Sequence, residues 1–302
     1  MTGDIDIIHH IGLIASNMDA LVARYEKLGF AFTPLSMPSI VLKPGGAPEP
    51  LGAGNRCAIF SNNYLEVLGV VDKPRWDSIT KEQRGPFDID PPLARYQGLH
   101  VLHFGAVDIE IVRARCVQHG IPCSDIRLFQ RPVDTPSGPQ TMKAKYMFFP
   151  QAGNLPSLTQ VAQHLTPDLV LQARHMKHRN GAKSVTETII CAGDPDDVAQ
   201  QYARYAGREV ERKRDFHIVD LGHSRIVIVG PASLGAVIPG AAPPTLPFLA
   251  GFTVATESVD TTRQILRAAD VPFAEHGGRV IVAAEYAFGS AILFEPQGAA
   301  RL

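Results

Sequence analysis

The sequence predicts an α+β fold in which four units, each ordered strand, helix and three strands, pair into two domains. Apolar strand-like runs alternate with short helical segments four times along the 302 residues. Each helix is expected to start after a good capping residue and to stop 12 or 13 residues later. One unit cannot bury its apolar face alone, so the units should pair into two curved sheets with helices outside. The caps are Asn17, Asp108, Asp194 and Ser258, and the stops are Gly29, Gly120, Gly207 and Asp270.

The first unit begins with an apolar run over residues 5–15. Apolar residues at helical spacing follow the cap at Asn17, which predicts a helix that ends at Gly29. Short strands are then expected at 31–35, 39–42, 56–61 and 64–70. A turn at Asn62 and Asn63 is expected to join the last two.

The same order returns in the other three units. The second unit is predicted to open with a strand before Asp108 and to continue with strands at 127–131, 143–149 and 158–164. The third opens at 184–193 and continues with strands at 209–215, 216–221 and 225–230. The fourth opens at 249–256 and continues with strands at 271–275, 279–284 and 290–296. We therefore expect an N-terminal domain over residues 1–165, a polar linker over 166–182 and a C-terminal domain over 183–302.

Composition excludes several classes of protein. Apolar residues make up 45% and charged residues 20% of the chain, which is typical of a folded globular protein. The net charge of −1 argues against an extended nucleic-acid interface. The four cysteines form no CxxC pair, and the N-terminus resembles no secretory signal, so we predict a cytoplasmic protein with free thiols. Residues 226–256 carry no charge, but their five prolines favour strand, linker and strand over a membrane helix.

Several segments resemble a known superfamily. A strand–helix–three-strand repeat, with a histidine on the first strand and a glutamate on the last, resembles the vicinal oxygen chelate (VOC) superfamily. The opening HHIGLIASNMDALVARYEKLGF is similar to its first strand and helix, and GAGNRCAIF, NYLEVLGV and HRNGA resemble the narrower glyoxalase-like domain family. The superfamily includes glyoxalase I, extradiol dioxygenases, and fosfomycin-resistance and bleomycin-binding proteins. The resemblance implies that paired units form a cup in which histidine and glutamate hold a divalent metal.

His10 and Glu66 are the first candidate metal ligands. Alignment by the helix cap puts His10 at the position of the superfamily's first ligand, and a packed strand histidine is the alternative. His9 and His10 are neighbours on a strand, so we expect them to face opposite sides, with only one inside the cup. Glu66 lies in an apolar strand, where a carboxylate is costly unless it is paired or bound to metal. It is therefore predicted to be a ligand and also a catalytic base, although alternation permits it to face outward.

The second unit fits the superfamily pattern less well. Counting from its cap places Val101 where His10 falls, so His103, two residues on and on the same face, is the candidate ligand. His164 and Gln151 are the two candidates from the last strand. His164 is the better ligand chemically, but the LTPDL that follows it also fits a histidine at a helix start.

Arg56 is the candidate substrate-binding residue, because its planar fork suits a carboxylate; a surface arginine is the alternative. Glu187 and Glu295 fall near the corresponding ligand positions of the second half. That domain is nevertheless expected to be degenerate and kept for packing.

The resemblance implies an enzyme that binds adjacent oxygens of a small substrate through a divalent metal. Zinc, manganese or nickel would suit isomerase or lyase chemistry, whereas iron with two histidines and one carboxylate would suit a ring-cleaving dioxygenase. A metal-free protein that binds or sequesters a small molecule is the alternative. A small-molecule substrate is the predicted partner, with no nucleic acid and no membrane, and a homodimer is possible.

Overall fold

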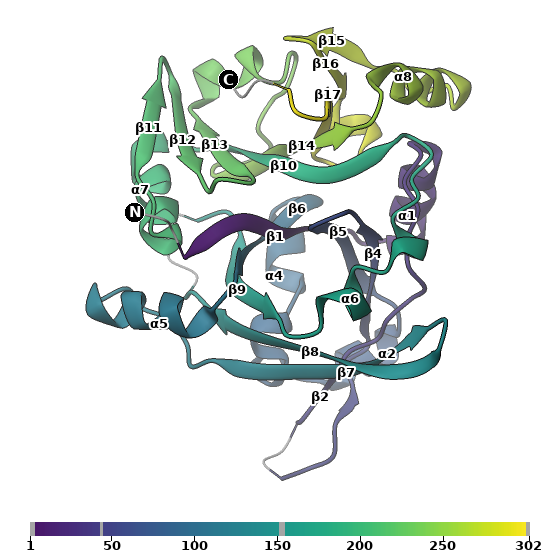
Figure 1. Ribbon diagram of the computed structural model, residues 1–302, viewed down its shortest axis with the longest axis vertical. Coiled ribbons are helices and arrows are strands. Elements are labelled where there is room, and N and C mark those ends of the chain that lie inside the picture. The colour runs from purple at the N-terminus through teal and green to yellow at the C-terminus, as the bar shows by residue number, and fades with distance from the viewer. Residues whose placement is uncertain (1–3, 43–44, 151–154, 300–302) are drawn as a thin grey trace.

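The computed structural model describes residues 4–42, 45–150 and 155–299. Its α+β fold contains two large curved sheets that pack against each other, with helices at the flanks (Figure 1). The first sheet has seven strands in the order β4-β5-β1-β6-β9-β8-β7. The second has eight strands in the order β11-β12-β13-β10-β14-β17-β16-β15.

The N-terminal sheet combines the first two predicted units. The first unit supplies the strands and helix β1 (Ile5–Ile14), α1 (Met18–Lys27), β4 (Ala53–Ile59) and β5 (Tyr64–Val70). The second supplies β6 (Gly98–Ala106), α5 (Ile109–Gln118), β7 (Arg127–Thr135), β8 (Gly138–Phe148) and β9 (Leu158–His164). The segment between them forms short helices that the sequence analysis did not anticipate: α2 (Lys73–Ser78), α3 (Lys81–Arg84), the 3-10 turn η1 (Gly85–Phe87) and α4 (Asp90–Arg95).

The second sheet has the same plan. Two short turns, α6 (Pro167–Val170) and η2 (Ala173–His175), lead into it. Its third unit consists of β10 (Ala182–Cys191), α7 (Pro195–Ala206), β11 (Val210–Lys213), β12 (Phe216–Asp220) and β13 (Arg225–Val229). After the 3-10 turn η3 (Pro231–Ala236), the fourth consists of β14 (Phe248–Thr256), α8 (Val259–Ala268), β15 (Ala274–His276), β16 (Arg279–Val282), η4 (Ala284–Tyr286) and β17 (Ala291–Pro296).

The uncharged stretch at 226–256 is strand, linker and strand, as its prolines predict. Within the described parts of the chain, none of the helices has the length and apolar character needed to span a bilayer.

All four predicted helix caps are confirmed. The side chain of each cap accepts a hydrogen bond from a backbone N–H in the first turn, which satisfies a donor that would otherwise lack a partner. The four residues predicted to stop the helices all have positive φ angles, and Asp270 adopts +53° without being a glycine. The repeat read from the sequence therefore reflects the local physics of helix ends.

The strand expected at 31–35 is not formed. Pro34 lacks the N–H that a ladder needs, and the segment instead runs irregularly beside β4. Its backbone still pairs there, because Thr33 donates to the Cys57 carbonyl and Ser36 exchanges two hydrogen bonds with Asn55. The predicted strand at 39–42 is reduced to β2 (Ser39–Ile40), which pairs with β3 (Glu49–Pro50) in a ribbon that projects from the body (Figure 1).

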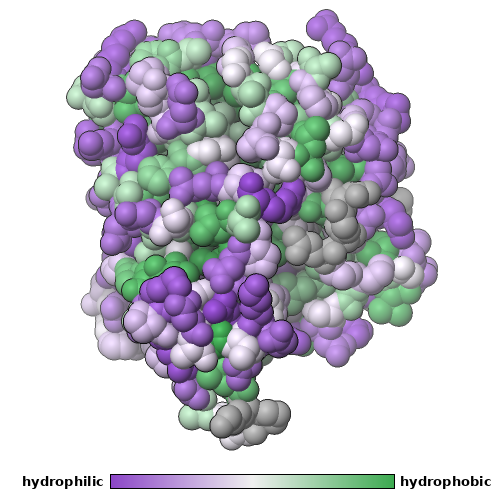
Figure 2. Space-filling model, turned by 180° about the vertical axis from the view of Figure 1, so that it is seen from behind, coloured by the Kyte–Doolittle hydropathy of each residue, from purple (hydrophilic) through white to green (hydrophobic). Residues whose placement is uncertain are grey.

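The two sheets share one apolar core. Ile8, Phe104, Phe252 and Phe294, from strands of both sheets, are fully buried in the same cluster. On the face of the molecule seen from behind the view of Figure 1, hydrophilic and hydrophobic residues are interspersed (Figure 2). One polar side chain also joins the sheets: Asn63 donates to the carbonyls of Ile8 and Val185, and accepts from the N–H of Val185. Asn63 is 1% exposed, so water cannot replace these bonds.

Replacing Asn63 with alanine should leave three buried backbone groups without partners. We expect N63A to lower the free energy of unfolding by about 3 kcal/mol, measured by urea denaturation. N62A is the matched control, because Asn62 lies next in the same turn and is exposed. Equal stability of the two variants would show that Asn63 does not join the sheets energetically.

Candidate active site

A β-bulge in β1 places two adjacent histidines on the same side of the sheet. In the antiparallel pair of β1 with β6, Ile8 lies opposite Phe104 and His10 lies opposite His103, so His9 is the extra residue. The Nδ1 atoms of His9 and His10 are 2.7 Å apart, and one ring donates a hydrogen bond to the other. The expectation that these residues face opposite sides is therefore wrong, because the bulge interrupts the alternation on which it was based.

Four imidazoles gather at this point of the inner, concave face of the first sheet. The ring of His10 stacks on Tyr64 with centroids 4.4 Å apart and meets His103 edge-on at 4.2 Å. The ring of His9 meets His164 at 4.3 Å. The structure thus brings together all three histidines that were candidate ligands, and it adds His9, which the alternation argument had excluded.

Glu66 points toward His10 from the neighbouring strand. Its Oε2 atom lies 3.6 Å from Nε2 of His10, and its Oε1 accepts a hydrogen bond of 2.7 Å from Asn55 Nδ2. Burial raises the pKa of Glu66 to about 7, against the opposing effects of the Asn55 hydrogen bond and the positive charge of Arg131. This carboxyl group therefore keeps its proton to a much higher pH than an exposed carboxyl does.

The imidazoles of the cluster are uncharged. Burial, reinforced by repulsion from the other rings, lowers the pKa of His9, His10 and His103 well below its usual value. Burial lowers the pKa of His164 to about 4. Burial also raises the pKa of Tyr64 well above 10, so its phenol stays protonated and can donate. Neutral imidazole is the form that binds metal ions.

Gln160 is a member of the cluster that the sequence analysis missed. It lies beside His103 in the parallel pairing of β6 with β9, and its amide is 2.6 Å from Nδ1 of His103. Because an amide offers both a donor and an acceptor, it can partner either tautomer of this histidine. The alternating pattern of strand 158–164 carried this signal, since Gln160, Ala162 and His164 share a face. Gln151, the other last-strand candidate, lies outside the described residues.

Arg56 does not join the cluster. It pairs with Val67 in the sheet, and Val67 points into the core on the opposite face from Glu66. Its Nε donates to the Thr33 carbonyl at 2.8 Å, and its guanidinium lies 4.0 Å from Glu26 on α1. Strand alternation turns Arg56 away from the cluster while it turns Asn55 and Cys57 inward, so the structure does not bring this predicted substrate-binding residue together with the candidate metal ligands.

The donor chemistry of the cluster fits a divalent metal. His10, His103 and Glu66 provide two neutral imidazoles and one carboxylate, a donor set that binds zinc or iron. When three such donors bind one ion, their donor atoms lie roughly 3 Å from one another. The Nε2 atom of His9 is buried and has no hydrogen-bond partner. In the parts of the chain that the structure describes, however, no three His, Cys, Asp or Glu side chains already converge in an arrangement that could hold an ion. Ligation by three donors would therefore require side-chain rotation.

The corresponding position in the second sheet is filled by ion pairs. The pairing of β10 with β14 contains the same irregularity, and Glu187 lies opposite Thr253 as His10 lies opposite His103. Glu187 is 1% exposed and is held by Arg225 at 2.6 Å, Arg279 at 3.0 Å and the Thr253 hydroxyl at 3.0 Å. Arg279 also binds Glu295 at 2.8 Å. These carboxylates are neutralised by arginines rather than left available as metal donors.

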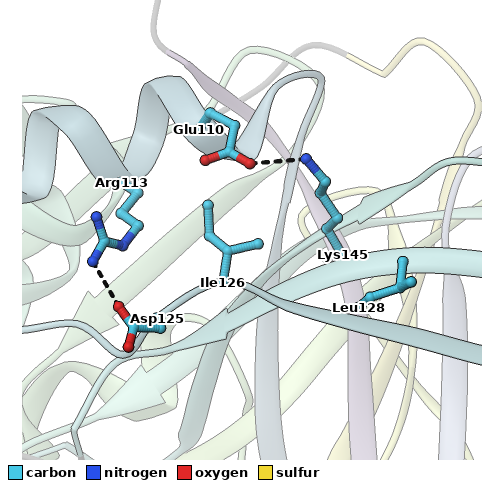
Figure 3. A pocket seen from close by; sticks show the side chains of 6 residues that line it. All are labelled: Glu110, Arg113, Asp125, Ile126, Leu128 and Lys145. Carbon is cyan, nitrogen blue, oxygen red and sulfur yellow. Dashed lines mark hydrogen bonds and ion pairs between the residues drawn. The ribbon is translucent and has the colours of Figure 1, made fainter.

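A hollow on the outer surface is separate from this cluster. It measures about 400 Å³ and lies between α5 and the β7–β8 hairpin (Figure 3). Its charged side chains are already paired, Glu110 with Lys145 at 2.8 Å and Arg113 with Asp125 at 2.7 Å. Exposed pairs of this kind contribute little and leave no free charge for a ligand.

Comparison with known proteins places the fold and then the family. The chain is similar to a hypothetical protein from Staphylococcus aureus (TM-score 0.61, 11% identity, 96% of this chain and 98% of that one). It also resembles a variant of 4-hydroxymandelate synthase from Streptomyces coelicolor (TM-score 0.55, 11% identity, 99% of this chain and 95% of that one). A third similar structure is a Mn(II)-bound glyoxalase from Novosphingobium aromaticivorans (TM-score 0.51, 12% identity, 97% of this chain and 82% of that one). No curated protein matches the chain.

The paired β–α–β–β–β units and these similarities define a protein of the VOC fold. The sequence matches the family described as "Glyoxalase-like domain" over residues 8–206, which is about two thirds of its length. The chain belongs to this glyoxalase-like domain family. The matched region contains the whole histidine cluster together with Glu66 and Gln160.

The raised pKa of Glu66 predicts a pH-dependent effect on stability. The folded protein keeps this proton up to about pH 7, whereas the unfolded chain releases it near the ordinary glutamate pKa of 4.5. Ionised Glu66 therefore costs stability progressively as pH rises through this window, by up to about 3 kcal/mol above it. Metal-free E66Q, which cannot ionise, should match the wild type near pH 4.5 and unfold at a higher temperature at pH 8.

The control for this prediction is E110Q, which removes an exposed carboxylate paired with Lys145. It should leave the dependence of melting temperature on pH almost unchanged. Identical melting temperatures of wild type and E66Q at pH 8 would contradict a strained, buried carboxyl.

Proposed function

We propose that the protein is a divalent-metal-dependent enzyme that acts on a small substrate with adjacent oxygen atoms. The observation that supports this function is the buried cluster of uncharged imidazoles around a carboxyl group with a pKa of about 7. Structural packing alone does not account for so many polar groups, because burying each costs free energy unless it is paired. The glyoxalase-like family and the metal-bound glyoxalase of similar fold point the same way.

His10, His103 and Glu66 are the residues that would hold the metal, with His164 as a further candidate donor. When bound, the ion would act as a Lewis acid toward the two substrate oxygens and stabilise negative charge that develops on them. His9 supports this role, because its hydrogen bond to Nδ1 of His10 fixes the tautomer and orientation of that ring. Gln160 fixes the orientation of the His103 ring through its contact with Nδ1.

Glu66 would serve as the proton-transfer group of this site. Asn55 fixes one carboxylate oxygen and leaves the other directed toward His10. Burial raises the pKa of Glu66 in the metal-free protein, and a bound cation would lower it again, so Glu66 would enter the reaction as a carboxylate. In that form it could accept a proton from the substrate and return it to a neighbouring atom. Tyr64 stays protonated and stacks on His10, so its hydroxyl can donate to a substrate oxygen. This chemistry suits an isomerase or lyase; a ring-cleaving dioxygenase would use the same donors with iron.

One observation favours a second function. Among the described residues, the candidate donors are not already converged on one point, and His9 and His10 bond to each other. A metal-free protein that binds a small molecule on the same inner face would need no such convergence.

Metal content measured by elemental analysis decides between the two functions. We expect protein purified without added metal, or after brief exposure to one divalent ion and desalting, to retain about one ion per chain. H10A and E66A should each lose most of it, because two of the donors lie on these residues. H223A is the control, since His223 is exposed on a turn of the second sheet. Metal content that is absent, or unchanged in H10A and E66A, would contradict this site.

A further inference from the structure

Arg131 is a cation on the inner face of the first sheet that the proposed reaction does not use. It lies on β7, directly opposite Met142 of β8, and β8 places Ala144 opposite His164. Residues that pair directly share a face, and so do residues two apart on one strand. Arg131 therefore lies on the same face as His164. Because the sheet curls, β7 and β8 lie across its interior from β1 and β5 (Figure 1).

The guanidinium of Arg131 is half-buried and unpaired. Throughout residues 4–42, 45–150 and 155–299, no carboxylate lies within ion-pair distance of it, and none of its nitrogens makes a hydrogen bond. Its charge nevertheless acts on the inner face, because it lowers the pKa of Glu66, Tyr64 and Cys57 against the effect of their burial. A half-buried arginine with no partner is a group prepared to bind an anion.

Aromatic side chains lie on the same face of the sheet as this cation. Phe129 lies two residues before Arg131, pairs with Ala144 and is 37% exposed. Tyr146 and Phe148 continue this face along β8, with ring centroids 5.3 Å apart. Phe148 lies opposite Gln160, which contacts His103. The aromatic surface thus runs from the free cation to the histidine cluster.

We propose that Arg131 binds a carboxylate of the substrate, and that the site takes small aromatic acids whose ring lies against Phe129. Arg131 presents two parallel N–H groups that match a carboxylate, while the ring of Phe129, two residues away on the same face, supplies apolar contact for the ring of the ligand. This inference rests on the proposed function only in placing the reacting oxygens beside Glu66. The preference for an anionic ligand depends on Arg131 alone.

The test compares a charged ligand with its neutral analogue. Phenylglyoxylate carries a carboxylate next to a keto oxygen, and its methyl ester keeps the ring and the keto group without the charge. Calorimetric titration of the wild type should show about tenfold to hundredfold tighter binding of the acid than of the ester, as expected for a charge-assisted bidentate contact. R131M should reduce acid binding to the level of the ester. R131K, which keeps the charge without the fork, should fall between them.

K143M is the matched control, because it removes one positive charge from the same hairpin. Lys143 pairs with Gln130, so its side chain faces the opposite side from Arg131. This variant should keep the wild-type preference for the acid. Unchanged ester binding by R131M shows that the variant is folded and makes the loss of acid binding specific.

Three results would overturn the proposal: equal binding of acid and ester by the wild type, binding of neither, or an acid preference that survives in R131M. Each titration is made on the protein as purified and again after metal removal with a chelator. An acid preference that depends on Arg131 in a protein without bound metal would support this inference and count against the proposed enzyme. Bound metal without an acid preference would support the proposed enzyme and count against this inference.

Discussion

The bulge in β1 is the constraint on which the candidate site depends. A regular strand would turn His9 and His10 to opposite faces, and one imidazole would enter the core between the sheets. The extra residue instead turns both rings to the inner face, where one hydrogen bond joins them and His103 lies directly across the ladder. Burial then keeps every ring uncharged, which makes the cluster a set of possible ligands rather than of cations.

The two halves of the chain share this backbone feature but use it differently. In the second sheet the corresponding bulge leads to Glu187, whose charge is neutralised by Arg225 and Arg279. Such a network satisfies its members with one another and needs no ligand to complete it. In the first sheet, Nε2 of His9 and the guanidinium of Arg131 have no protein partner within the described residues. The contrast therefore holds for the two matching positions: the carboxylate of Glu187 is fully partnered, whereas, in the part of the chain that the structure describes, the cluster around His10 keeps a ring nitrogen and a nearby cation without partners.

Features set by residues close together in the sequence, such as helix caps, can be predicted from the sequence. Features set by which strands pair, and in which register, cannot be predicted in the same way. The caps at Asn17, Asp108, Asp194 and Ser258 could be read directly, because a cap and its helix lie within a few residues. The bulge at His9 could not, because it is defined by the register of β1 against a strand about ninety residues away. The same limit applies to Arg56, which the sequence indicates as a candidate, and to Arg131, which it does not. Both are arginines on strands, and only the pairing of each strand shows which face its side chain occupies.

Glu66 is the residue whose presence packing explains least. The equivalent position in the second sheet is Val227, since it pairs with Ile189 of β10 as Glu66 pairs with Gly12 of β1. Val227 is 1% exposed in an apolar cluster, so the fold accepts a hydrocarbon side chain there. A carboxyl group at this point instead costs stability when it ionises, and even Asn55 and the charge of Arg131 leave its pKa raised. That unrelieved cost is what a group held ready to exchange a proton or bind a cation would show, and it argues for a chemical rather than a structural role for Glu66.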